Sequence, residues 1–150
     1  MSKPLKITLI IGIVANVVLW SLVVFGQIWV ATNQKIVGWD AVTTNIEGDP
    51  IPADNSIEYV AYLANAITDP DKTNPAEIAT INETQYIVTL TSEGKYFFGV
   101  KAVRKDANGE IVGESEIAWS DDARYAAAGQ TFGLQHFLPP AAPTGLAPTD

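Results

Sequence analysis

The chain has 150 residues, no cysteine, a single histidine and a formal net charge of −8. Without cysteine it forms no disulfide and performs no thiol chemistry. The excess of acidic residues argues against a basic nucleic-acid-binding surface, so no nucleic-acid partner is predicted.

The longest uniform feature is an uncharged run between Lys6 and Lys35. Its apolar part, residues 7–31, exceeds the roughly 20 residues that a helix needs to cross a bilayer. A secretory signal peptide is the alternative, but its apolar core is usually about 7–15 residues long. The run therefore predicts a transmembrane helix over residues 7–31, behind a short N-terminal segment of residues 1–6.

Charges on the two sides of this run indicate an orientation. Lys3 and Lys6 precede it, whereas only Lys35 follows closely, and all 17 acidic residues lie after it. Positive charge favours the cytoplasmic side of a spanning helix. The predicted localisation is therefore the plasma (inner) membrane, in contact with lipid. The protein would cross it once, with a cytoplasmic N-terminus and a periplasmic or extracellular domain.

One stripe of the predicted helix combines a glycine with two amide side chains. Because polar residues inside a bilayer usually face protein, this stripe is expected to contact helices of other membrane-protein subunits. Its residues are Gly12, Asn16, Trp20, Val23 and Gln27.

From residue 35 the apolar period changes to two, which indicates strands. KIVGWDAV offers Ile36 and Trp39 as buried residues. In three further runs, alternate residues share one face; these are 59, 61 and 63, then 86, 88 and 90, and then 96, 98, 100 and 102. Asn108-Gly109 is typical of a hairpin turn, and SEIAWS is expected to be the last strand. Short strands separated by turns predict an antiparallel sandwich.

These residues resemble a fibronectin type III domain over residues 35–122. Trp39 matches its core tryptophan on strand B, and Tyr59 matches the tyrosine on strand C, although Ala61 stands where a valine is usual. Leu90 and Tyr96 match the leucine and tyrosine of the tyrosine corner. The resemblance implies an all-β fold class, an antiparallel Ig-like sandwich of seven strands here preceded by one transmembrane α-helix. It also implies a binding or spacer role.

Residues 123–150 follow this domain as an aromatic and proline-rich tail. Its apolar side chains either form a partner-binding surface or fold onto their own domain. They are Tyr125, Phe132, Leu134, Phe137 and Leu138, joined by the single histidine, His136.

The end of the tail resembles the proline-rich strand A that opens fibronectin type III domains. The predicted helix leaves no room for strand A before strand B. The segment made of Pro143, Thr144, Gly145 and Leu146 is therefore a candidate for that strand, docked in its own domain or in a neighbouring copy. The alternative is a loose tail or linker.

No motif for a catalytic site, a cofactor or a metal is present; a lone histidine does not build a zinc site. The expected function is a non-catalytic accessory subunit of a larger membrane complex, for example a respiratory or photosynthetic one, that clamps partners through its helix and its domain. Two alternatives remain open. One is a self-assembling surface filament or adhesin subunit, and the other is a membrane-tethered ligand-binding module.

Overall fold

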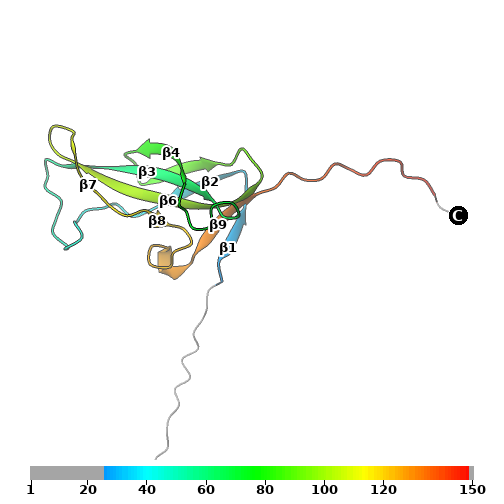
Figure 1. Ribbon diagram of the computed structural model, residues 1–150, viewed down its shortest axis with the longest axis horizontal. Coiled ribbons are helices and arrows are strands. Elements are labelled where there is room, and N and C mark those ends of the chain that lie inside the picture. Colours follow the sequence, from blue (N-terminus) through cyan, green and yellow to red (C-terminus); the bar gives the residue numbers. More distant parts are fainter. Residues whose placement is uncertain (1–25, 149–150) are drawn as a thin grey trace, which may run out of the picture.

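The computed structural model describes residues 26–148, which fold into two β-sheets (Figure 1). The larger sheet has the strand order β1-β9-β6-β3-β4, with β7 and β8 also paired to β6, and β2 and β5 form the second sheet. The strands are β1 (Ile28–Ala31), β2 (Gln34–Gly38), β3 (Ser56–Asn65), β4 (Ala76–Ile81), β5 (Gln85–Thr89), β6 (Gly94–Lys105), β7 (Ile111–Glu114), β8 (Ala118–Trp119) and β9 (Phe132–His136).

Both sheets contribute side chains to one hydrophobic core. The second sheet supplies Val37 from β2 and Val88 from β5, and the larger sheet supplies Ala61, Phe98 and Leu134. Two sheets that bury facing apolar side chains against each other have the arrangement of a β-sandwich. The prediction of a β-sheet domain with this arrangement is confirmed.

β6 is the central strand of the larger sheet. Its even-numbered residues from Tyr96 to Val100 face the core, as the period-two pattern predicts, because successive side chains point to opposite faces of a strand. All ten residues of β3 pair along one side of β6. On the other side β9, β8 and β7 pair with it one after another.

The predicted fold class is wrong in its helical part. Within residues 26–148 no helix is both long and apolar enough to cross a membrane, and the helical structure there is one 3₁₀ turn, Ala127–Gly129. Residues 28–31, predicted as the end of the helix, form strand β1 instead. The predicted membrane localisation rested on that helix and is corrected on the same finding. The rest of the predicted helix, residues 7–25, lies outside the described residues.

β1 is a strand because all four of its residues pair with β9. Ile28 pairs with Phe132 and Ala31 with Gln135, in parallel register. Two further backbone bonds, from Ile28 N–H to the Thr131 carbonyl and from Thr32 N–H to the Gln135 carbonyl, flank the ladder. An apolar run alone does not distinguish a strand from a helix, so hydropathy misassigned these residues. The parallel pair also makes the sheet mixed rather than wholly antiparallel.

The prediction for strand β2 is wrong at one residue. Ile36, predicted to be buried, is 59% exposed, whereas its neighbour Val37 lies in the core. Val37 and Trp39 are two residues apart and both pack inward, so Ile36 between them points to the opposite face. Trp39 is stacked on Phe98 and meets the edge of Tyr59.

Candidate functional site: exposed edges, a polar pocket and an aromatic face

The residues predicted to form a partner-binding tail divide into two groups. Phe132 and Leu134 belong to β9, and Leu134 is 0% exposed, so these two fold onto their own domain. His136 ends the same strand. Phe137 and Leu138 follow it and are 57% and 65% exposed. Only this last pair, at the foot of the tail, remains a candidate contact surface.

Tyr125 lies in the loop between β8 and β9 and is also tied to its own domain. Its hydroxyl donates a hydrogen bond to Glu116, and this bond raises the pKa of the Tyr125 phenol above its ordinary value. Arg124 binds Asp122 in the same loop at 2.7 Å. These contacts hold the loop against the segment before β8, so Tyr125 serves the loop's own structure.

The other predicted sites lie elsewhere. Four residues of the helix stripe, Gly12, Asn16, Trp20 and Val23, fall outside the described residues, and Gln27 is exposed just before β1. The strand A candidate, Pro143, Thr144, Gly145 and Leu146, belongs to no strand of this structure. Docking of that segment into a neighbouring copy stays a prediction.

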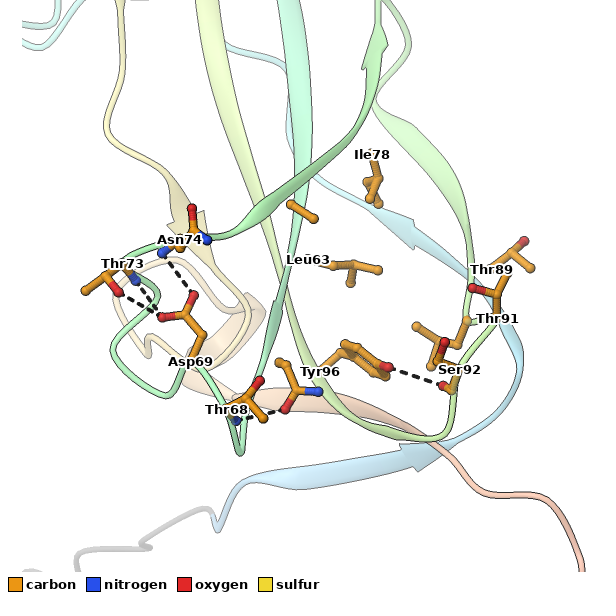
Figure 2. A pocket seen from close by; sticks show the side chains of 13 residues that line it. Leu63, Thr68, Asp69, Thr73, Asn74, Ile78, Thr89, Thr91, Ser92 and Tyr96 are labelled. Atoms are coloured by element: carbon orange, nitrogen blue, oxygen red, sulfur yellow. Dashed lines mark hydrogen bonds between the residues drawn. The ribbon is translucent and has the colours of Figure 1, made fainter.

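A polar pocket of about 590 Å³ opens between β4 and β5, strands that belong to different sheets (Figure 2). Leu63 and Ile78 lie in its middle, with Asp69, Thr73 and Asn74 of the β3–β4 loop on one side. The opposite side is made by the β5–β6 segment and by Tyr96, whose hydroxyl donates to the Ser92 carbonyl at 3.2 Å.

The most polar side chains of this pocket are already engaged by their own loop. The Asp69 carboxylate accepts hydrogen bonds from Thr73 N–H at 2.9 Å, from Thr73 Oγ1 at 3.0 Å and from Asn74 N–H at 3.1 Å. Asn65 Oδ1 similarly accepts from two loop amides, those of Ile67 and Thr68. The pocket has a size that suits a small ligand. The Asp69 and Asn65 side-chain oxygens, however, already accept hydrogen bonds that stabilise the β3–β4 loop.

The bonds to Asp69 predict a pH-dependent loop. Desolvation of the carboxylate would raise its pKa, but hydrogen bonds from Asn74 and Thr73 outweigh it and hold the pKa of Asp69 below 3.8. A depressed folded-state pKa adds stability that is present above the unfolded value and lost as pH falls through the folded one. We therefore expect the Thr73 and Asn74 amides to lose hydrogen-exchange protection below pH 3.8, as measured by NMR.

Asp69→Asn provides the control for this loop. Its amide carries no charge to titrate, so the Thr73 and Asn74 resonances should no longer report a carboxylate in that range. If both amides titrate identically in the variant and in the parent chain, another group controls the loop.

An aromatic face on the outside of the larger sheet was missed by sequence reasoning. The Trp29 and Phe97 ring centroids lie 5.6 Å apart. Lys95 lies over Trp29 at 4.7 Å, and Lys72 lies over Phe97 at 4.9 Å. Lys72 also forms an ion pair with Asp121 at 2.7 Å. The alternating pattern of β6 predicts that Phe97 points outward, which is a signal for one half of this face. The other half could not be predicted, because the sequence places Trp29 in the predicted transmembrane helix.

Two glycines make room for tryptophans on this face. A Cβ at Gly133 would lie 2.4 Å from the Trp29 ring, and one at Gly99 would lie 2.7 Å from Trp119. Both distances are shorter than real carbon contacts allow, so only glycine lets these rings lie on the strands. Phe97 is 8% exposed and both tryptophans are partly buried, which indicates that the cluster stabilises the sheet.

The second sheet presents an apolar pair to solvent. Ile36 on β2 and Ile87 on β5 are directly opposed, and they are 59% and 52% exposed. Within residues 26–148, β2 and β5 pair only with each other, so each has one edge without a neighbouring strand. An edge strand presents unpaired N–H and C=O groups, which are a template for pairing with another chain, and here exposed isoleucines lie beside it.

Within the same residues no cluster of three or more histidine, cysteine or acidic side chains is placed to hold a metal ion. Searches of protein-family models, of curated proteins and of solved structures found no match to this chain. Its function therefore has to be argued from its own surfaces.

Proposed function

We propose that this protein is a non-catalytic binding module, a structural or accessory component that holds partner proteins through an exposed C-terminal arm. The observation that carries the proposal is the arm itself, residues 137–148. Phe137 and Leu138 lie exposed at its foot, and the rest runs away from both sheets (Figure 1).

The arm has the physical properties of a recognition segment. Four prolines, at positions 139, 140, 143 and 148, favour an extended backbone that loses little entropy on binding. The Leu138 N–H donates a hydrogen bond to the Glu93 carboxylate, which ties the foot of the arm to the domain. Two exposed apolar side chains on a tethered, extended segment favour burial against another protein.

We further propose that the domain is fibronectin type III-like, a fold that serves binding and spacing in many proteins. Two local arrangements support this. Trp39 packs between Tyr59 and Phe98, as the core tryptophan of that family would. The Tyr96 hydroxyl donates to the Ser92 carbonyl a few residues upstream, which is the geometry of a tyrosine corner.

Mutating the foot of the arm tests the proposal. The double variant Phe137→Ser, Leu138→Ser would be compared with the parent chain in the native source, using chemical cross-linking and mass spectrometry to quantify attached proteins. We expect the variant to lose at least about tenfold of one fixed set of cross-linked partners, because two apolar anchors of an interface are removed.

Ile67→Ser is the matched control, because Ile67 is an equally exposed apolar residue on the β3–β4 loop. It should leave the same partners in place. If the double variant keeps its thermal midpoint and its full set of partners, the arm does not hold them and the proposal fails.

A further inference from the structure

The free edge of β2 has a defined hydrogen-bonding phase. Trp39 N–H bonds the Thr84 carbonyl and Leu90 N–H bonds the Asn33 carbonyl, so the odd-numbered residues of this segment point their backbone groups at β5. Opposed residues in an antiparallel pair alternate between exchanging two hydrogen bonds and exchanging none. The even-numbered residues therefore point their N–H and C=O groups away from β5, toward the open edge.

The backbone N–H and C=O groups of one even-numbered residue, Gln34, already have a hydrogen-bond partner. Thr32 Oγ1 donates to the Gln34 carbonyl and accepts from the Gln34 N–H. The first residue of β2 is therefore not free to pair with another strand. Ile36 and Gly38 remain. Within residues 26–148 their two N–H groups and two C=O groups have no protein partner.

We propose that two copies of this chain associate by antiparallel pairing of β2 with β2, in a register centred on Val37. Ile36 then lies opposite Gly38 of the partner subunit, and Gly38 lies opposite Ile36 of the partner subunit. These two pairs are of the type that exchanges two hydrogen bonds, so four bonds form. They use every open donor and acceptor of both edges and leave the Thr32 contacts undisturbed.

The side chains fit the same register. Ile36 projects from the outer face, and the residue across from it is a glycine, which leaves space for the isoleucine. The pairing joins the two-stranded sheets of the two copies into one four-stranded sheet. Ile36 and Ile87 of both copies then line one apolar surface, in the isologous manner of a two-fold dimer.

Among residues 26–148, the rival strand donor is the C-terminal arm, and it is poorly suited to this edge. An added strand needs N–H groups at alternate positions, and the four prolines of residues 137–148 have none. A second β2 offers matched donors and acceptors. The proposal does not depend on the arm, so it stands or falls separately from the proposed function.

Sedimentation velocity of the purified full chain, from about 1 µM to about 1 mM, tests the pairing over the range of weak association. We expect a reversible dimer. Ile36→Pro should weaken it at least tenfold, because the imide removes one edge donor and bonds nothing on β5. Gly38→Val should also weaken it by filling the space across from Ile36. A Cβ there lies 3.6 Å from the nearest atom of its own domain, so the monomer should accept the substitution.

Ile111→Lys is the control, because Ile111 on β7 has the same 59% exposure as Ile36. It should leave dimerisation unchanged. Hydrogen exchange supplies a second readout: protection of the Ile36 and Gly38 amides should rise with protein concentration. Three results would each overturn the proposal. They are a monomer at every concentration, a dimer that neither β2 variant weakens, and protection independent of concentration, which would place another segment of the same chain on the edge.

Discussion

Replacing Leu134 by alanine is expected to lower the free energy of unfolding by about 2–5 kcal/mol, the usual range for a large aliphatic residue removed from a core. Leu134 is 0% exposed and belongs to the core cluster that both sheets share. It is also paired to Tyr96 of β6, on the inward face of the larger sheet. Urea denaturation followed by far-ultraviolet circular dichroism measures the change.

Leu138→Ala is the matched control, with the same substitution four residues later. Leu138 is 65% exposed, so its replacement should change stability by less than about 0.5 kcal/mol. If the two variants lose similar stability, β9 does not contribute to the core and the division of the tail between sandwich and arm is wrong.

Gly133→Ala is expected to lower the free energy of unfolding by about 1–3 kcal/mol, the typical cost of overpacking. The new methyl group would lie 2.4 Å from the Trp29 ring, which packs on Phe97 and lies under Lys95. Trp29 has to leave that position, and β1 then loses the contact between Trp29 and Phe97. Denaturation together with the amide exchange of residues 28–31 would report both effects.

Gly113→Ala supplies the comparison, because a Cβ at Gly113 meets nothing within 4 Å. The same methyl group is therefore added to a strand without a clash. Equal losses at Gly113 and Gly133 would mean that the cost comes from the backbone and not from the tryptophan.

The interior strands of this domain could be predicted from the sequence because their side chains alternate. In β6, Phe98 faces the core and Phe97 the outer face, as the period-two pattern indicates. Asn108-Gly109 predicted the turn between β6 and β7, and Gly109 has the positive φ of +81° that such turns require.

The edges could not be predicted in this way. β1 is an apolar segment at the end of a long apolar run, so composition did not separate it from a helix. β9 follows a twelve-residue interval after β8, and nothing local to FGLQH shows that it returns to β6. Both strands are fixed by pairing with residues distant in the chain, which a local pattern does not contain.

The parallel pair of β1 and β9 has a consequence for how the protein is made. It joins residue 28 to residue 132, so β1 has no partner strand until β9 has left the ribosome. The hairpin of β6 and β7 can form earlier, because its contacts are local. Of the strands within residues 26–148, β1 is therefore synthesised first and paired last, and Trp29 cannot pack on β9 until Gly133 emerges.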